Sequence, residues 1–585
     1  MPDPEEQPAP VDLGDPSRAV AVLRNIPVLA GVSDGVLAEL GAHLVRTEID
    51  AGEWLFRVGE PSDSLYVVES GRLAVMDESG GLVREIGRGS PLGELGVIAG
   101  EPRSASVMAV RDSALWRMSS DAFWQLFDDQ PAFQRALLGS VSSLLRASHA
   151  IDRDRRLRVF AVIPSSERAP LEEATAALEQ ALRKFGSVAV VRDGGSNGAS
   201  RRDLAERYGP ALDRAEQHND WVILAGSQGE TWRDFATTQA DRIVIVAGDP
   251  EPPSWLAEPL ADPTDLVLCT PHINYVAWWD AVDPASQVHV GSHPTAPELA
   301  PLARRLAGRS IGIVLSGGGA RGLAHLGVYE ELLNSGVHLD RFGGTSAGAL
   351  GAAVGAMGMT PEEATEALRR YVVQPKVLSD YTVPIVSLIR AGRIETFGQA
   401  VFGDTLIEEL PKSVYTVSAD MVSGTAVIHR RGSLWTAVRA SISIPGVMPP
   451  VPHGDQLLVD GGLLNNIPAD IMAVSPDGPI ICVDLRRSYA PSSGFSIASM
   501  HPPTIVRQVI TGTTAALPSL QETLMRAVDL AASYVDYEHL PHVTAVIRPE
   551  VSHIGILNLG EIDSAIEAGR VATRAVLEAH PELVG

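Results

Sequence analysis

The sequence predicts a multidomain α/β protein with an N-terminal β-roll, a middle α/β spacer domain and a C-terminal α/β hydrolase domain. Three observations carry this prediction. Short strands separated by glycine turns begin near Ile49, an alternation of strands and helices begins at Arg158, and glycine-rich loops follow apolar strands beyond Leu306. The 585 residues suffice for about four domains of ~150 residues. We expect a disordered tail at residues 1–16 and domains at residues 17–152, 153–305 and 306–585.

Charge and composition exclude several classes of partner and location. The formal net charge is −25, whereas nucleic-acid binding requires clustered Lys and Arg, so no nucleic-acid partner is expected. The tail is rich in Pro, Asp and Glu and lacks the basic start and apolar run of a signal peptide. No segment approaches the ~20 uninterrupted apolar residues of a membrane span. We therefore expect a cytoplasmic protein without a transmembrane segment, able to contact the inner face of the membrane locally and peripherally.

The two cysteines, Cys269 and Cys482, lie in apolar, strand-like runs far apart in the sequence. We interpret them as buried thiols in a reducing compartment, in preference to a disulfide. Neither a CxxC nor an HExxH pattern occurs. The sequence therefore predicts no metal site and no required cofactor.

Helix-like pieces at residues 17–46 come first, and the β-roll follows. Short alternating strands at Trp54–Phe56, Ser64–Val68, Gly71–Met76 and Val83–Ile86 are typical of a small barrel or roll. A helix is expected over residues 123–150, and residues 152–158 form a charged linker.

The stretch Gly93–Val107 resembles the phosphate-binding cassette of cyclic-nucleotide-binding domains, and the match extends back to Gly52. A carboxylate such as Glu94 can accept a hydrogen bond from a ribose 2′-hydroxyl. Arg103 can pair with the cyclic phosphate, and N–H groups at a helix start add donors. The resemblance implies a site at Gly93, Glu94, Arg103 and Ser104 for cAMP or cGMP as a regulatory ligand, with Ser104 where the family varies with base preference. The alternative is a structural roll that binds nothing.

The spacer domain follows from Arg158. Apolar strands are expected at Val159–Ile163, Val188–Val191, Trp221–Leu224, Arg242–Val246 and Leu266–Cys269, with helices such as Leu171–Lys184 and Arg201–Gln217 between them. This alternation predicts a largely parallel sheet. Phosphate-binding folds of this kind carry a glycine loop after the first strand, whereas Pro164–Arg168 contains no glycine. We therefore expect a spacer that binds no nucleotide.

The C-terminal domain contains the spacing G-x-S-x-G at Gly344–Gly348, after a strand expected at Val337–Phe342 and before an apolar helix expected at Ala349–Met359. This is the pattern of a nucleophile elbow, in which a strand turns sharply into a helix and presents a serine, here Ser346. The same spacing recurs around Ser196, so the pentapeptide alone cannot choose between the two serines.

Two further stretches favour Ser346. A strand at Ser310–Leu315 runs into Gly317–Gly322 and then a helix at Leu323–Leu333, and the glycines allow N–H groups to converge on a developing oxyanion. Much later, the strand Leu457–Val459 leads into Asp460, which glycines follow. A nucleophile, an N–H cradle and a general base are the parts of an acyl-transfer site.

These blocks, in this order, resemble the patatin-like phospholipases, which use a Ser-Asp dyad and no histidine. The match runs from Leu306 to the C-terminus, and Ser441–Gly446 looks like a fourth family block. The resemblance implies that Ser346 is the nucleophile and Asp460 is the base. It also implies that the oxyanion hole lies at Gly317, Gly318 and Gly319, with the N–H groups of Gly318 and Gly319 holding the oxyanion. The remaining positions that the family motifs share are Arg321, Gly322, Gly344, Gly348, Gly461 and Gly462.

The combination of regulatory, spacer and catalytic parts resembles the neuropathy target esterase family over most of the chain. The resemblance implies hydrolysis of phospholipid or lysophospholipid esters. A carboxylate is a weak base at neutral pH unless its pKa is raised, so we expect Asp460 to lie in a partly desolvated pocket.

Several alternatives remain open at this point. Gly317, Gly319 and Gly322 also fit G-x-G-x-x-G, with Asp340 near the place of a ribose-binding acid, as in a dinucleotide-binding oxidoreductase. That interpretation leaves the serine and aspartate motifs without a purpose. A second alternative is a nucleotide sensor with a non-catalytic hydrolase domain. His325 could serve as a base, although a packing role is favoured.

Two apolar or amphipathic segments of the C-terminal domain also need an interpretation. Tyr381–Ile389 could be a lid or a lipid-facing wall, but plain core is favoured. The segment Ser519–Tyr534 looks like an ordinary amphipathic helix with a solvated face, because it lacks a basic cluster that would meet lipid head groups.

Overall fold

The computed structural model describes residues 41, 43–77, 82–87, 90–129, 158–195, 200–226, 229–257, 260, 263–383, 385–486, 537–555 and 558–584. Several predicted segments lie outside these residues: the tail, nearly all of the helix-like pieces, the later part of the helix expected over 123–150, nearly all of the charged linker, Ser196, and the helix expected over 519–534. The chain divides into two compact units, Met1–Gly248 with Leu260–Asp265, and Asp249–Pro259 with Leu266–Gly585.

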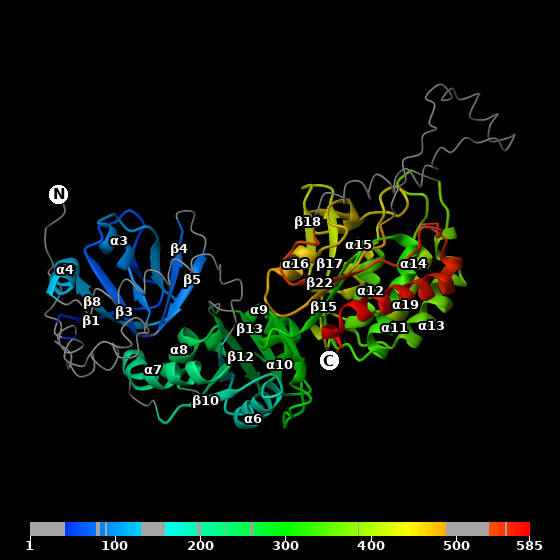
Figure 1. The fold of residues 1–585 in the computed structure, drawn as a ribbon. Helices are drawn as coiled ribbons and strands as arrows, with labels where there is room; N and C mark the ends of the chain where they lie inside the picture. Colours follow the sequence, from blue (N-terminus) through cyan, green and yellow to red (C-terminus); the bar gives the residue numbers. More distant parts are fainter. Residues whose placement is uncertain are drawn as a thin grey trace, which may run out of the picture. The chain divides into compact units, whose positions relative to one another are not determined.

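The first unit begins with a β-roll, drawn in blue in Figure 1. Two antiparallel sheets, in the orders β1-β8-β3-β6 and β2-β7-β4-β5, share one apolar core that includes Val68, Leu73 and Leu115. The helix α3 (Glu94–Ala99) follows β6, and α4 (Ser120–Asp129) follows β8. The strands are β1 (Val45–Ile49), β2 (Trp54–Phe56), β3 (Ser64–Ser70), β4 (Arg72–Met76), β5 (Leu82–Gly87), β6 (Pro91–Leu92), β7 (Ser106–Ala109) and β8 (Ser113–Ser119). The predicted β-roll is confirmed.

The same unit continues into the spacer region. Its strands lie in the order β10-β11-β9-β12 and are parallel, as predicted, and the loop after β9 contains no glycine. A capping box at Ser200 and Asp203 starts α7, and its two hydrogen bonds satisfy N–H groups that the first helical turn leaves free. The elements are β9 (Val159–Pro164), α6 (Leu171–Leu182), β10 (Val188–Arg192), α7 (Arg201–His218), β11 (Trp221–Ala225), α8 (Glu230–Gln239) and β12 (Arg242–Ala247). The remaining strands of this sheet are β13 (Thr264–Leu268) and β14 (Ser286–His289).

The second unit contains the sheet that carries the candidate site. Its order is β19-β20-β17-β16-β15-β21-β22, and β18 pairs with β17. The strands β17, β16, β15, β21 and β22 are parallel, whereas β20 runs antiparallel to β17. The strands are β15 (Ile311–Leu315), β16 (Leu339–Thr345), β17 (Ser413–Asp420), β18 (Ala426–His429), β19 (Val451–His453), β20 (Gln456–Asp460), β21 (Ile480–Val483) and β22 (Val543–Ile547).

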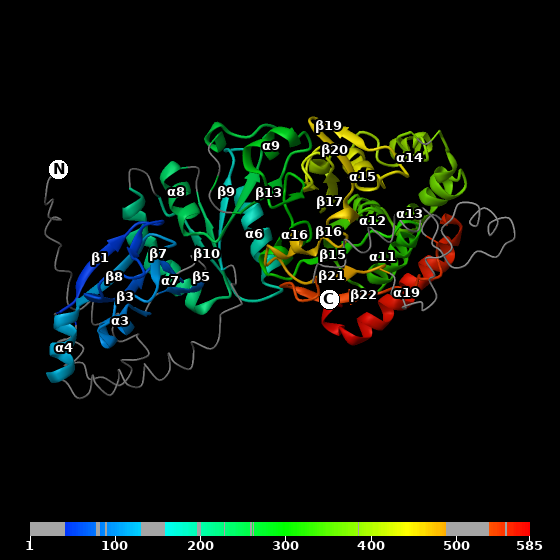
Figure 2. The same cartoon turned by 90° about the horizontal axis from the view of Figure 1, so that it is seen from above.

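Helices cover both faces of this sheet (Figures 1 and 2). Because side chains alternate along a strand, Ile313 and Leu315 join the core beneath α11, α12, α13 and α19, while Val314 joins the core beneath α16. The helices are α11 (Ala324–Asn334), α12 (Ala347–Ala356), α13 (Pro361–Leu368), α14 (Gly392–Val401), α15 (Leu434–Ser441), α16 (Ala469–Ala473) and α19 (Ile562–Ala579). The predicted mixed α/β fold is confirmed.

The structure also bears on disulfides, metal sites and membrane-spanning helices. Both cysteines, Cys269 and Cys482, are buried free thiols, as predicted. Within the described ranges, no group of three or more His, Cys, Asp and Glu side chains is arranged to hold a metal ion. No helix in the described part of the chain has the length and apolar character needed to cross a membrane.

Candidate active site

Ser346 occupies a sharp turn between β16 and α12, which is the predicted nucleophile elbow. Its backbone has φ 56° and ψ −123°, a conformation that residues with a Cβ rarely adopt. The turn leaves no space for side chains at its two glycines. A Cβ on Gly344 would lie 2.3 Å from the Gly348 carbonyl oxygen, and a Cβ on Gly348 would lie 2.0 Å from the Leu315 carbonyl oxygen. The G-x-S-x-G spacing is therefore a steric requirement of this turn.

The central strand β17 brings Ser346 and Asp460 together. Thr345 pairs with Val417 on one side of β17, and Asp460 pairs with Ser418 on the other side. The two functional residues therefore flank neighbouring positions of one strand. The Ser346 hydroxyl donates to Asp460 Oδ2 at 2.6 Å. The predicted nucleophile and base are thus in direct hydrogen-bond contact.

Asp460 is buried, with only 3% of its surface exposed. Burial raises the pKa of Asp460 to about 6, although hydrogen bonds from the Ser346 hydroxyl and the Gly462 N–H act in the opposite direction. The Gly462 N–H reaches Asp460 Oδ1 at 2.8 Å, which leaves Oδ2 for the serine. The carboxyl group is therefore a stronger base than an exposed aspartate, and it is still ionised at neutral pH.

The glycine loop after β15 passes beside Ser346. A Cβ on Gly317 would lie 3.0 Å from the Ser346 Cβ, and a Cβ on Gly322 would lie 2.3 Å from the Ala347 Cβ. The Gly317 N–H donates to the Asn466 carbonyl at 3.2 Å. In the described part of the chain, the N–H groups of Gly318 and Gly319 have no backbone acceptor. The expectation that Gly317 belongs to the oxyanion hole is therefore wrong for its N–H, which Asn466 already occupies, whereas the amides of Gly318 and Gly319 remain available for a ligand.

Two other residues near this loop stabilise it from behind. The buried Arg321 donates from Nε to the Ile554 carbonyl oxygen at 3.3 Å, which ties the loop to a later segment. His325 is buried on α11, and its Nε2 lies 2.9 Å from the Ser316 carbonyl oxygen. Burial lowers the pKa of His325 to about 4, so this imidazole is neutral and donates to the loop. The favoured packing role of His325 fits this position.

Sequence reasoning noted the block Ser441–Gly446 but assigned no role to its serines. Ser441 ends α15, where its hydroxyl accepts the Ser346 N–H at 2.9 Å and donates to the Val417 carbonyl at 2.6 Å. The Ser443 carbonyl accepts the Asp460 N–H at 2.9 Å. This block therefore holds the backbones of both dyad residues. The recurring Ser-Ile pattern was the available signal, but it does not reveal these partners.

An apolar cavity of about 100 Å³ begins at the glycine loop and the elbow. Gly319 and Gly322 of the glycine loop are part of its lining, and so are Ala347, which follows Ser346, and Leu350 and Val354 of α12. Apolar side chains from α11 and α13 complete most of the lining. A chain of methylene groups attached to a carbonyl at Ser346 is the kind of group that fits such a cavity.

The dinucleotide-binding alternative fails on the position of Asp340. Because β15 and β16 are parallel and Ile311 pairs with Leu339, Asp340 lies at the start of β16, while the glycine loop lies beyond the other end of β15. A ribose-binding acid would have to lie at the same edge as the glycine loop. Instead Asp340 accepts two hydrogen bonds from Arg304, at 2.6 and 2.8 Å.

The favoured interpretation of Tyr381–Ile389 as core is wrong for most of this segment. Tyr381, Val383, Ile385 and Val386 are 65%, 74%, 87% and 64% exposed, and only Ser387 and Ile389 at its end are buried. Pro384 lies outside the described residues. The physical reason is that an antiparallel bridge between Tyr381 and Ile389 closes a loop whose tip projects from the domain.

A second candidate site lies in the β-roll. Arg103 is 4% exposed, and its guanidinium donates to the carbonyls of Gly93 at 3.1 Å and Ser64 at 2.7 Å and stacks over Phe56 at 4.1 Å. Among the side chains that the structure describes, the carboxylate paired with it is that of Asp63, at 3.7 Å, which is exposed. Burial lowers the pKa of Arg103, as expected for a cation without a close buried counter-ion.

The other residues predicted for the nucleotide site lie at the start of α3 or on the surface. Gly93, with φ 72°, precedes α3, and Glu94 is the first residue of that helix. The side chain of Glu94 is not among those that the structure describes. Ser104 is exposed. The structure therefore brings together Gly93 and Arg103, where a buried cation lies beside the start of a short helix.

Comparisons with known proteins place both candidate sites in matched regions. Residues 313–473 match the model of the patatin-like phospholipase family, and residues 46–130 match that of the cyclic nucleotide-binding domain. An uncharacterised NTE family protein of Mycobacterium tuberculosis is 45% identical over 97% of both chains. The neuropathy target esterase sws of Drosophila melanogaster is 29% identical, and mouse patatin-like phospholipase domain-containing protein 6 is 28% identical. The chain spans 38% of each animal protein, and the matches cover 79% and 75% of this chain.

The raised pKa of Asp460 predicts how the reactivity of Ser346 depends on pH. The protonated carboxyl cannot accept the serine proton, so labelling of Ser346 by an uncharged fluorophosphonate should fall about tenfold per pH unit below pH about 6 and level off above it. Labelling rates across this range, read by mass spectrometry, test the expectation. A plateau that extends down to the ordinary pKa of aspartate, about 3.9, would contradict it.

Proposed function

We propose that this chain, which belongs to the NTE family, is a serine esterase that hydrolyses carboxylic ester bonds of phospholipids or lysophospholipids through Ser346 and Asp460. The observation that carries the proposal is the 2.6 Å hydrogen bond between these side chains at a strained elbow. A match to the patatin-like phospholipase model surrounds the serine and the aspartate.

The reaction that this geometry supports is a two-step acyl transfer. Ser346 attacks the ester carbonyl while Asp460 accepts its proton and passes it to the leaving alcohol. The N–H groups of Gly318 and Gly319 hold the oxyanion of each tetrahedral intermediate. Water then cleaves the acyl-enzyme, with Asp460 again as the base. No metal ion takes part in these steps.

The apolar cavity supports a lipid as the acyl donor. Ala347, which follows the nucleophile, is part of its lining, and we place the acyl chain of the substrate in this cavity. His325 and Tyr329 are the polar side chains that line it, and both lie beside predominantly apolar neighbours. A head group would remain outside, on the opposite side of the ester. We propose a cytoplasmic enzyme that reaches its lipid by peripheral contact with a membrane.

We further propose that cAMP or cGMP binds at Arg103 and regulates the esterase. The match to the cyclic nucleotide-binding domain supports a nucleotide ligand. A cyclic phosphate would supply the close anion that the buried Arg103 guanidinium lacks among its described contacts, and the N–H groups at the start of α3 would add donors.

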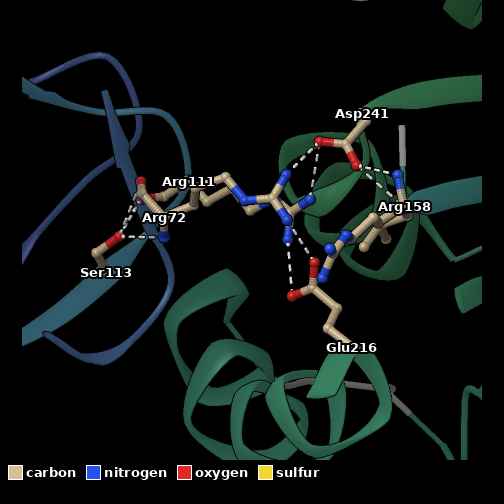
Figure 3. A network of polar contacts seen from close by, with 7 residues as sticks. Arg72, Arg111, Ser113, Arg158, Glu216 and Asp241 are labelled. Carbon is tan, nitrogen blue, oxygen red and sulfur yellow. Dashed lines mark hydrogen bonds and ion pairs between the residues drawn. The ribbon is translucent and has the colours of Figure 1, made fainter. Parts of the chain in front are cut away.

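A buried charge network joins the β-roll to the spacer region within the first unit (Figure 3). Arg72 donates to Asp241 at 2.7 Å and to Glu216 at 2.5 Å, and Arg111 donates to the same carboxylates at 3.0 and 3.3 Å. Burial alone would raise the pKa of Asp241, but the two arginines and the N–H groups of Arg158 and Val159 hold it below its usual value.

The network offers a route for regulation because β3 connects it to the nucleotide cassette. Ser64, whose carbonyl binds Arg103, begins β3, and Arg72 follows the turn after its last residue. A ligand that moves Arg103 would therefore act on the strand that leads to the network. Such coupling requires the nucleotide to bind two states of the enzyme unequally.

Removal of the dyad side chains tests the catalytic proposal. Ser346→Ala should abolish turnover of phospholipid and lysophospholipid esters, and Asp460→Asn should nearly do so, because the first lacks the nucleophile and the second lacks the base. The measurement is a screen of defined lipids with purified protein. Ser196→Ala is the matched control. Loss of activity in that variant would indicate that the active site lies at the other G-x-S-x-G sequence, around Ser196.

The cavity predicts a dependence on acyl chain length. Leu350→Trp should lower kcat/KM for long acyl chains relative to short ones by about tenfold or more, because the larger side chain fills the space behind the elbow. A series of esters that differ only in acyl length measures this ratio. Val571→Trp, at an exposed position of α19, is the control. An unchanged chain-length profile in Leu350→Trp would mean that the acyl chain binds elsewhere.

The charge network predicts a separation of nucleotide binding from regulation. The Glu216→Gln variant should still bind the cyclic nucleotide that the unmodified enzyme binds, and this binding should still release heat. The ratio of ester turnover with and without that nucleotide should move towards one. Calorimetry and turnover on the same samples measure both quantities. Glu179→Gln, which removes a partly exposed carboxylate of α6 that pairs with Arg183, should leave the ratio unchanged. An unaltered rate of the unmodified enzyme at saturating nucleotide would reject regulation.

A further inference from the structure

The segment Tyr381–Val386, named here the apolar tip, is the most concentrated exposed apolar stretch of the described residues. Four of its side chains are large, apolar and more than 60% exposed. No other six-residue stretch in the described part of the chain exposes more than two large apolar side chains. Single exposed apolar residues are ordinary, whereas a cluster of this kind marks an interaction surface.

The apolar tip stands on a rigid base. The Thr382 N–H donates to the Leu388 carbonyl at 3.0 Å, which closes the loop. Leu388 and Ile389 then donate to the carbonyls of Gly446 and Val447, at 2.9 and 3.0 Å. Ile389 is 2% exposed and belongs to the main core of the second unit. The base therefore holds a fixed position while the side chains of the tip extend into solvent.

Positive charge surrounds this base, in contrast to the whole chain. Lys376, Arg390 and Arg393 are exposed, and no carboxylate of the described residues forms a salt bridge with them. The Arg393 guanidinium donates to the carbonyl of Pro375 and to Ser379. Asp380, the one carboxylate within residues 375–393, accepts the Gly392 N–H. The segment 375–393 carries a net charge of +2 within a chain of −25.

We infer that the apolar tip is the membrane-docking surface of this protein, and that it inserts into a phospholipid layer containing anionic lipids. Tyr381 suits the head-group level, while Val383, Ile385 and Val386 suit the acyl boundary. The three cations would then face lipid phosphates, which supplies charge complementarity to an anionic layer.

The place of the docking surface connects it to the candidate active site. Gly446 and Val447, which bind the loop base, follow Ser443, whose carbonyl holds the Asp460 N–H. A lipid-bound tip would therefore lie a few residues from the block that positions the dyad. This inference rests on the proposed esterase function for its purpose, but the binding itself needs no turnover.

Sedimentation with vesicles tests the inference independently of catalysis. Ile385→Ser with Val386→Ser should weaken binding to phosphatidylcholine vesicles containing phosphatidylglycerol by about tenfold or more, because the inserting side chains are lost. The matched control is Val422→Ser with Val474→Ser, which removes two valines that are 70% and 85% exposed elsewhere. An equal loss of vesicle binding in the two double variants, or no vesicle binding by the unmodified protein, would overturn the assignment of the docking surface.

Two further measurements complete the test, one of the role of the cations and one of the insertion of the apolar tip. Lys376→Gln with Arg390→Gln should remove the gain in binding that phosphatidylglycerol gives, whereas Arg309→Gln should not. A thiol-reactive, environment-sensitive fluorophore would label Ile385→Cys selectively, because both native cysteines are buried. Its emission should shift to the blue on addition of vesicles. An unchanged spectrum, or a blue-shifted one before vesicles are added, would show that the tip stays in water or is covered by the protein itself, and either result overturns the inference.

Discussion

The candidate active site depends on one buried hydrogen bond, from the Ser346 hydroxyl to Asp460 Oδ2. This hydrogen bond can form because β17 lies between β16, which ends just before Ser346, and β20, which ends at Asp460. The antiparallel β20 brings an aspartate to the same level at which the parallel β16 delivers a serine. A shift of either strand by one residue would send the functional side chain to the opposite face of the sheet. The register of β17 with its two neighbours is therefore the constraint that the chemistry requires.

The buried position also supports the proposal that a carboxylate acts here in place of the histidine that many serine hydrolases use. An exposed aspartate is too weak a base to take a serine proton near neutral pH, but burial raises the pKa of Asp460 to about 6. The same effect acts in the opposite direction on His325, whose pKa falls to about 4 because burial disfavours the imidazolium. Burial thus makes Asp460 more basic and keeps His325 neutral.

Local patterns in the sequence were sufficient to predict the β-roll, the parallel spacer sheet, the elbow and the glycine loop, since each depends on neighbouring residues. The contacts that hold the dyad could not be predicted in this way. Ser441 binds the Ser346 N–H across 95 positions of sequence, and its hydroxyl has no feature that separates it from other serines. The Gly317 N–H donates to the Asn466 carbonyl, and the local sequence around these two residues does not indicate this distant contact either. The apolar tip was expected to be core because apolar residues are usually buried, and its exposure depends on where its base docks.

Recognition of anions by so acidic a chain requires that positive charge act locally. Fields from distant charges are screened over about 8 Å at physiological ionic strength, so the net −25 weakens approach but does not decide binding at a contact. Arg103 is buried, and among the described side chains it pairs only with the exposed Asp63 carboxylate, so its charge acts at one point. The cations beside the apolar tip are exposed but lie around apolar side chains that insert independently of charge. Because distant charges are screened, each proposed anion site depends on cations close to the anion: the buried Arg103 in the β-roll, and the cations that lie beside the inserting side chains of the apolar tip.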